Sequence, residues 1–294
     1  MAGRAARAVY AMVLSAVVGA AIAGCAPGTV PGVTVPGVTV YDDLDFGAPE
    51  GIRLDVCAPA ERAPSGPAII AVHGGGWSQG DKRERPWREA CEWLASEGFV
   101  VFQANYRLSP AHPYPAAIDD IVSAVEWIRG ADQVERFGHD PGRIGAFGDS
   151  AGGNLVALLG TRGDGPTAVG SRVSAVVELS APIDLTLAGT ALGDLGTGFQ
   201  RVQLDYLGCD SYDLCPQAAD ASPSRHVDAS DPAFFIAHSS HEFIPVEQAA
   251  AFAHSLGEAR VDVTYVERAG SGHGLALLDD ALRQQISAWL HSTL

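Results

Sequence analysis

Ser150 stands in a sequence pattern that is typical of an enzymatic nucleophile. It occupies the centre of Gly148-Asp149-Ser150-Ala151-Gly152, which follows the apolar residues 143–147 and precedes an expected helix at 151–159. A serine on a sharp strand-to-helix turn has a strained backbone, and the glycines beside it let the strand and the helix approach each other. Its hydroxyl is then exposed at the edge of the sheet. The pattern therefore predicts nucleophilic catalysis by Ser150.

A glycine-rich segment upstream has the composition of a loop that stabilises negative charge. His73-Gly74-Gly75-Gly76 directly follows the apolar run 68–72, which is typical of a buried strand. Backbone N–H groups reach a developing alkoxide only where no Cβ crowds the approach, so glycine suits these positions. We expect the N–H groups of Gly75, Gly76 and Ala151 to form an oxyanion hole. One donor of this kind typically stabilises the transition state by about 3–4 kcal/mol.

The general base is expected at His273. This histidine lies in the small-residue loop 270–274, between an expected strand that begins at Val261 and an expected C-terminal helix at 275–290. Chemistry in an open α/β sheet is placed in loops that follow the carboxyl ends of strands. A serine nucleophile on such a turn needs a histidine base and an acid that orients it. These three residues follow the chain order serine, acid, histidine, and His273 fits that order.

These residues and several flanking segments resemble the hormone-sensitive-lipase-like esterases of the α/β-hydrolase superfamily. The segments that carry the resemblance are the oxyanion loop 73–82, the strand and loop 105–117, the helix residues Asp119, Asp120 and Trp127, and the nucleophile block 140–154. They occur in the family's order, and the resemblance extends over about residues 40–290. It implies an α/β-hydrolase fold and hydrolysis of a small-molecule ester, with no cofactor and no metal.

The acid of the expected triad departs from the family's pattern. The strand near 233–238 ends in a segment that commonly reads His-Gly-x-x-Asp in related hydrolases, whereas here Ser239 replaces the glycine and Glu242 the aspartate. Glu242 can still orient the histidine, since the role requires only a carboxylate that accepts from Nδ1–H. We therefore assign Glu242 as the acid and keep Asp231 as the alternative. Asp149 is expected to satisfy donors near the start of the helix instead.

The N-terminal segment is typical of an exported lipoprotein. Residues 1–24 combine an arginine-containing start with an apolar stretch, and they end in Ile-Ala-Gly before Cys25. This stretch is shorter than the roughly 20 apolar residues of a spanning helix, so it reads as a removable signal. Cys25 is then the lipidation candidate, and an ordinary secretory signal is the alternative. Residues 25–40 repeat Pro-Gly-Val-Thr-Val and are expected to form a tether to the membrane.

The cysteines agree with export to an oxidising compartment. Apart from Cys25, the chain contains Cys57, Cys91, Cys209 and Cys215. Cys209 and Cys215 flank a short polar segment, and we expect a local disulfide between them. For Cys57 and Cys91, buried free thiols and a second disulfide remain equally open.

Length and pattern predict one α/β-hydrolase domain at 41–294, with a mostly parallel central sheet and helices on both faces. The strands are expected near 52–57, 68–73, 99–105, 143–147, 173–180, 233–238 and 261–267. The segment 184–231 has weaker periodicity and is expected to form a small cap over the acyl pocket. Because the first core strand is expected near residue 52, there is no room for a long N-terminal cap, and an open site is predicted.

Three functions are consistent with these residues. The first is a carboxylesterase acting on short-chain acyl esters, the second an amidase or peptidase with the same triad, and the third a non-catalytic binding protein. The formal net charge of −16, with Lys82 as the only lysine, argues against nucleic-acid binding. We favour the carboxylesterase, because a binding protein does not need Ser150, His273 and the glycine loop together.

Overall fold

The computed structural model describes residues 36–61 and 65–294. The expected signal segment, Cys25 and the first copy of the Pro-Gly-Val-Thr-Val repeat lie outside the described residues. Within the described ranges, no helix is both long enough and apolar enough to cross a membrane.

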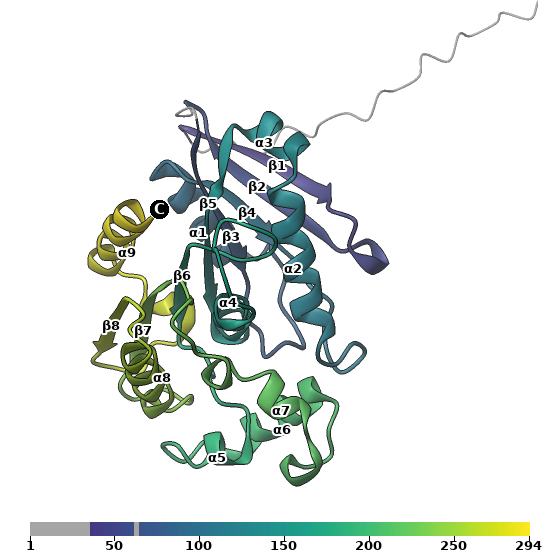
Figure 1. Ribbon diagram of the computed structural model, residues 1–294, viewed down its shortest axis with the longest axis vertical. Coiled ribbons are helices and arrows are strands. Elements are labelled where there is room, and N and C mark those ends of the chain that lie inside the picture. Colours follow the sequence, from purple (N-terminus) through teal and green to yellow (C-terminus); the bar gives the residue numbers. More distant parts are fainter. Residues whose placement is uncertain (1–35, 62–64) are drawn as a thin grey trace, which may run out of the picture. The chain divides into compact units, whose positions relative to one another are not determined.

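One twisted sheet forms the centre of the described chain, with strand order β1-β2-β4-β3-β5-β6-β7-β8 (Figure 1). β1 is antiparallel to β2 and β2 is antiparallel to β4, whereas the strands from β4 to β8 in this order run parallel. The strands are β1 (Val38–Asp45), β2 (Arg53–Pro59), β3 (Gly66–Val72), β4 (Val100–Ala104), β5 (His139–Asp149), β6 (Ala175–Leu179), β7 (Ala233–Ser239) and β8 (Val263–Arg268). The predicted α/β-hydrolase architecture is confirmed.

Helices cover both faces of this sheet. The main ones are α1 (Arg85–Ser96), α2 (Ala116–Ile128), α3 (Ala131–Phe137), α4 (Ser150–Thr161), α8 (Val246–Glu258) and α9 (Asp280–Thr293). α1 and α9 share one apolar cluster with the sheet, which includes Leu94 and Leu290. α2, α4 and α8 share the cluster on the other face, which includes Leu155 and Phe252. Every residue of α4 is buried, as expected for a helix that is apolar on all sides.

At the N-terminal edge of the sheet, the expected start of the first strand and the expected end of the tether are both wrong. The first strand does not begin near residue 52, because β1 starts at Val38 and pairs with β2 from Val38↔Pro59 to Asp45↔Arg53. The last residues of the expected tether, Val38 to Val40, therefore belong to the sheet. Their β-branched side chains favour a strand, and the prolines and glycines before them obscured this signal.

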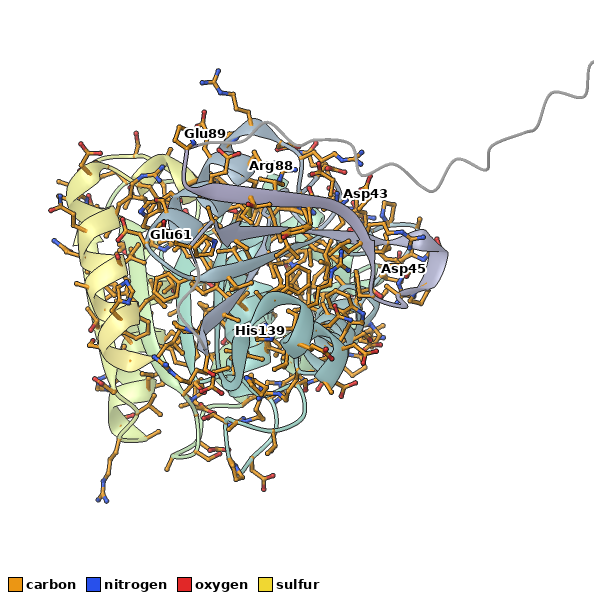
Figure 2. The ribbon with its side chains drawn as sticks, turned by 90° about the horizontal axis from the view of Figure 1, so that it is seen from above. Asp43, Asp45, Glu61, Arg88, Glu89 and His139 are labelled. Carbon is orange, nitrogen blue, oxygen red and sulfur yellow. A yellow bond between two sulfur atoms is a disulfide. The ribbon has the colours of Figure 1, made fainter. Side chains whose placement is uncertain are left out.

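A charged cluster joins this edge to the segment that follows the glycine loop. Lys82 is buried, and its Nζ lies 2.6 Å from Asp55 and 2.9 Å from Asp43. Arg88 of α1 lies 2.6 Å from Asp55 and 2.7 Å from Asp42. Figure 2 shows Asp43 and Arg88 on this side of the molecule. The cluster holds the chain between the glycine loop and α1 against β1 and β2.

The segment 184–231 contains short helices, as a small cap would. They are α5 (Leu187–Thr190), α6 (Thr197–Leu207) and α7 (Gln217–Asp220), with single 3₁₀ turns between and after them. A disulfide joins Cys209 to Cys215 at the end of α6, and a second joins Cys57 of β2 to Cys91 of α1. The second bridge ties an antiparallel strand to the helix that covers it.

The C-terminal helix begins later than the sequence pattern indicated. The expected helix at 275–290 is divided into a 3₁₀ turn, η4 (Gly274–Leu277), and α9. The Asp279 side chain accepts a hydrogen bond from the Leu282 N–H at 2.9 Å and caps α9. Apolar residues on both sides of this aspartate gave a continuous helical period, but the cap starts the helix at Asp280.

Candidate active site

Ser150 lies on a strained turn between β5 and α4. Its φ is +51°, in the left-handed region that residues with a Cβ rarely adopt. The turn closes only because Gly152 has no side chain, since a Cβ there would lie 2.1 Å from the Val72 carbonyl oxygen. Such strain costs on the order of 1–3 kcal/mol and is common at functional sites. The packing of α4 against β3 therefore fixes the position of the Ser150 hydroxyl.

The glycine loop after β3 presents free backbone donors beside Ser150. Gly75 has φ +112°, and its carbonyl accepts from the N–H groups of Ser78 (3.2 Å) and Gln79 (3.1 Å), which closes the loop into a turn. A Cβ at Gly75 would lie 2.1 Å from the Gln79 oxygen. Among the hydrogen bonds of residues 36–61 and 65–294, none is donated by the N–H of Gly75 or Gly76. These donors are free to bind a substrate oxygen.

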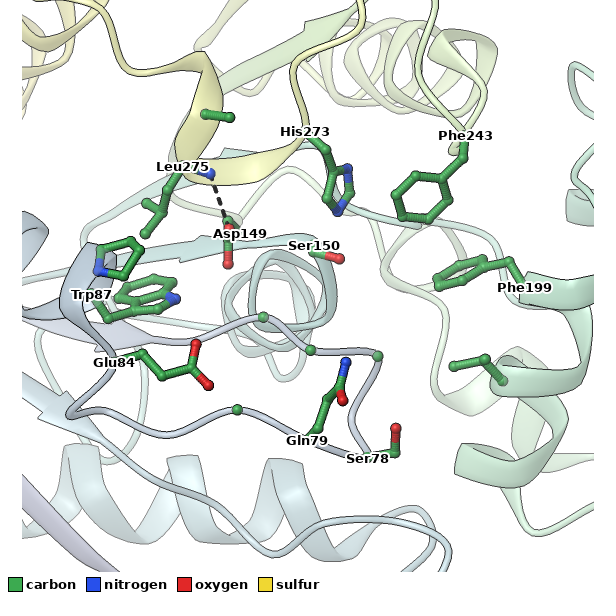
Figure 3. A pocket seen from close by; sticks show the side chains of 17 residues that line it. Ser78, Gln79, Glu84, Trp87, Asp149, Ser150, Phe199, Phe243, His273 and Leu275 are labelled. Carbon is green, nitrogen blue, oxygen red and sulfur yellow. Dashed lines mark hydrogen bonds between the residues drawn. The ribbon is translucent and has the colours of Figure 1, made fainter.

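The structure brings Glu242, not Asp231, to His273. The Nδ1 atom of His273 forms a short hydrogen bond with Oε2 of Glu242, whose side chain is 1% exposed. Asp231 lies elsewhere and accepts from the Asp228 N–H at 3.0 Å. His273 is partly exposed, and its ring faces the same pocket as Ser150 (Figure 3).

Two residues that the sequence analysis did not assign hold the Glu242 carboxylate. His238 is fully buried at the end of β7, and its Nε2 lies 3.2 Å from Glu242 Oε1 and 2.9 Å from the Ile244 carbonyl. Ser239 donates its N–H to the same Oε1 at 3.4 Å and its hydroxyl to the Gly272 carbonyl at 2.6 Å. Ser239 thus connects the segment that carries the acid to the loop that carries His273.

A further carboxyl group is buried near this segment. Glu178 of β6 is fully buried, and burial raises its pKa to about 8, with a further contribution from the Glu242 charge. Burial also lowers the pKa of His238. A glutamate inside the otherwise apolar run 175–179 was the sequence signal for this group.

Asp149 has a different structural role from the one expected. Its side chain makes no capping hydrogen bond to α4, although it stands at the N-cap position. Instead, Oδ2 accepts from the N–H of Leu275 at 3.0 Å, just after His273 (Figure 3). Burial raises the pKa of Asp149 to about 6. Asp149 therefore links the nucleophile turn to the histidine loop.

These groups surround one pocket of about 690 Å³ at the carboxyl ends of the parallel strands. On one side of Ser150 its wall is aromatic, with Phe199 from α6 and Phe243 from the segment after β7 (Figure 3). The Phe243 ring lies 5.4 Å from Phe199 and 4.4 Å from His273. Val202, one turn after Phe199 on α6, also lines the pocket. Trp87, Leu275 and Glu84 form the other side (Figure 3).

No cluster of His, Cys, Asp and Glu residues suited to a metal ion occurs in the described part of the chain. The arrangement in the pocket suits nucleophilic chemistry. It combines a serine on a strained turn, an imidazole bonded to a carboxylate, and backbone donors without acceptors.

Comparison with known proteins agrees with this fold. The family model BD-FAE matches residues 54–256, more than half of the chain. The chain belongs to the BD-FAE family. Esterase LipC of Mycobacterium tuberculosis is 34% identical over 226 residues, which cover 73% of this chain and 54% of that protein. The chain thus spans about half the length of this curated relative.

Two solved structures are similar to this chain over most of its length. An acetyl ester-xyloside bifunctional hydrolase from Caldicellulosiruptor lactoaceticus is 26% identical, with TM-score 0.69, covering 85% of this chain and 90% of that one. A truncated carbohydrate esterase from gut microbiota is 23% identical, with TM-score 0.74, covering 87% and 96%. The second likeness concerns the fold alone. The resemblance to esterases of the α/β-hydrolase superfamily is confirmed.

Proposed function

We propose that this protein is a serine carboxylesterase with the triad Ser150, His273 and Glu242. The observation that carries the proposal is the hydrogen bond between His273 and the buried Glu242, in a pocket that Ser150 and the glycine loop also line. The names of the relatives support the same chemistry, since LipC is an esterase and the Caldicellulosiruptor protein acts on an acetyl ester.

The reaction proceeds in two stages. His273 takes the proton of the Ser150 hydroxyl as its oxygen attacks the ester carbonyl, and Glu242 stabilises the resulting imidazolium. The carbonyl oxygen becomes an oxyanion and accepts from the N–H groups of Gly75, Gly76 and Ala151. The alcohol leaves with the proton from His273. Water then attacks the acyl-enzyme by the same route and releases the acid.

We propose short acyl chains as the preferred substrates. The cap consists of short helices, and among the described residues it contributes only Phe199 and Val202 to the pocket, beside Phe243. A long acyl chain would extend past these side chains into water, so its additional methylenes would gain little from burial. We expect kcat/KM for p-nitrophenyl acetate to exceed that for the octanoate at equal concentration of enzyme. A clear preference for the octanoate would contradict the short-chain proposal.

Replacing the nucleophile tests the mechanism directly. We expect Ser150→Ala to lower kcat by at least about 10³-fold, because the acyl-enzyme forms on the hydroxyl of this turn and alanine has none. Esterase assays on the wild type and the variant measure this, with circular dichroism as the check of folding. Labelling by a fluorophosphonate should occur in the wild type and be absent from the variant. Unchanged turnover in Ser150→Ala would remove the serine mechanism, and faster hydrolysis of a matched anilide than of the ester would favour an amidase.

We also propose that the enzyme is exported and anchored by a lipid at Cys25. The signal-like residues 1–24 and the two disulfides support export, since disulfides persist mainly in oxidising compartments. Expression of the full chain with a radiolabelled fatty acid is expected to label the wild type but not Cys25→Ser. Secretion of an unlabelled wild-type chain would favour the ordinary secretory signal.

A further inference from the structure

Glu84 places a carboxylate without a cationic partner in the wall of the pocket. Its side chain lines the pocket on the side opposite the aromatic wall, as Figure 3 shows. Within the described residues it has no ion pair and no side-chain hydrogen bond. The arginines on either side of it have other partners, because Arg83 contacts Asp43 and Arg85 contacts Glu89 at 2.8 Å.

No cationic side chain that lines the pocket offsets this charge. Among the described lining residues, the ionisable groups besides Glu84 are Asp149 and His273, and none is a lysine or arginine. Asp149 is buried and directed to the Leu275 N–H, whereas Glu84 is exposed. Glu84 also lies close enough to Asp149 to contribute to the raised pKa of that carboxyl, after the larger effect of burial. Glu84 therefore places a negative charge on this side of Ser150 that no described lining residue neutralises.

The two sides of the pocket differ in what they can bind. The apolar side, with Phe199, Val202 and Phe243, suits the hydrocarbon part of an acyl group. The alcohol part of the ester then lies toward Glu84. We propose that Glu84 selects esters whose alcohol part carries a positive charge and rejects those whose alcohol part carries a carboxylate. This inference rests on the proposed esterase function and names the substrate class for that same site.

The expected selectivity is moderate. Glu84 is exposed, so water weakens its attraction for a cation several ångströms away, and the expected preference is about 3- to 10-fold in kcat/KM. Salt screens such an interaction, because the Debye length falls from about 10 Å at 0.1 M to about 3 Å at 1 M ionic strength. A preference that arises from shape would not respond to salt.

Three acetate esters of similar length test the inference. Acetylcholine carries a positive charge, 3,3-dimethylbutyl acetate has the same shape without the charge, and 4-acetoxybutanoate carries a negative charge. In the wild type, kcat/KM should fall in that order, with a cation-to-neutral ratio of about 3 to 10 at low salt. The ratio should approach 1 in 1 M NaCl.

Two glutamate variants identify the group responsible. Glu84→Gln should bring the cation-to-neutral ratio close to 1, whereas Glu126→Gln should leave it at the wild-type value. Glu126 is exposed on α2 and does not line the pocket, so this control changes the net charge equally. The inference is overturned if wild type shows no cation preference, or if Glu84→Gln keeps it. If none of the three esters is hydrolysed although p-nitrophenyl acetate is, the inference alone is overturned. If p-nitrophenyl acetate is not hydrolysed either, the esterase proposal itself fails.

Discussion

Glu242 and Asp149 are both buried at the candidate active site, and their surroundings differ. Glu242 contacts the ring nitrogen of His273, lies 3.2 Å from His238, and accepts from the Ser239 N–H. Asp149 accepts at 3.0 Å from the Leu275 N–H, and the Gly74 N–H is its other backbone donor. Both side chains are shielded from water, but only Glu242 contacts imidazole rings.

This difference shows how position along the chain can mislead. Asp149 is adjacent to Ser150 in sequence, yet it lies on the turn and reaches the loop after His273 rather than the imidazole. Glu242 is distant in sequence, and the parallel pairing of β7 and β8 brings its segment beside the His273 loop. For Asp149 the effect of burial outweighs that of its backbone donors and raises its pKa.

The largest effect on turnover is expected when Glu242, the carboxylate bonded to His273, is replaced. Glu242→Gln should lower kcat by about 10³- to 10⁴-fold, because the amide no longer stabilises the imidazolium or fixes the histidine tautomer. Asp231→Asn serves as the matched control and should keep activity within about 2-fold. Steady-state kinetics with p-nitrophenyl acetate measure both. Loss of activity in Asp231→Asn alone would show that Asp231 is the acid and that the assignment to Glu242 is wrong.

The next largest effect is expected for the contribution of Asp149 to the free energy of unfolding. Burial raises the pKa of Asp149 from 3.8 to about 6, so the folded state binds more protons than the unfolded state between these values. Its contribution to stability is therefore present below pH 4 and is lost as pH rises through 6. Relative to Asp149→Asn, the wild type should lose roughly 2–3 kcal/mol in unfolding free energy between pH 4 and pH 7.

Urea unfolding at several pH values measures this difference, with the disulfides kept intact. Asn retains an oxygen that can accept from Leu275, so the variant isolates the charge. Asp164→Asn, in an exposed turn, is the control for a carboxylate at the surface. A wild-type to Asp149→Asn difference that stays constant with pH would show that folding does not raise the pKa of Asp149.

The smallest effect on turnover is expected at Ser239, which connects the segment of Glu242 to the loop of His273. Ser239→Ala removes the hydroxyl that donates to the Gly272 carbonyl, so the His273 loop should move more freely relative to Glu242. We expect kcat to fall about 3- to 10-fold with KM nearly unchanged.

The neighbouring Ser240 provides the comparison, since its side chain is partly exposed and bonds to His241 at 2.7 Å. It accepts only a longer hydrogen bond from the His273 loop, at 3.4 Å from the Gly270 N–H. Ser240→Ala should therefore retain kcat within about 2-fold. If Ser239→Ala changes thermal stability but leaves kcat unchanged, Ser239 is structural and does not position the triad.

The parts of the site that could be predicted from sequence are those with local geometry. The turn at Ser150 and the loop at Gly75 depend on close approaches that only glycine permits, so their sequence patterns are specific. The alternating pattern of strands and helices likewise predicted the parallel sheet. In contrast, β1 was missed, because a strand at the edge of a sheet is short and the Pro-Gly residues before it are typical of a linker.

The remaining features depend on contacts between segments that are distant in sequence. The sequence by itself predicted the nucleophile, the glycine loop and the positions of the strands from β2 to β8, since each follows from residues within a few positions of one another. Only the tertiary structure decided that Glu242 rather than Asp231 meets His273, that His238 and Ser239 hold it, and that Glu84 faces the pocket. These depend on sheet register and loop packing, which bring together side chains that no local pattern relates.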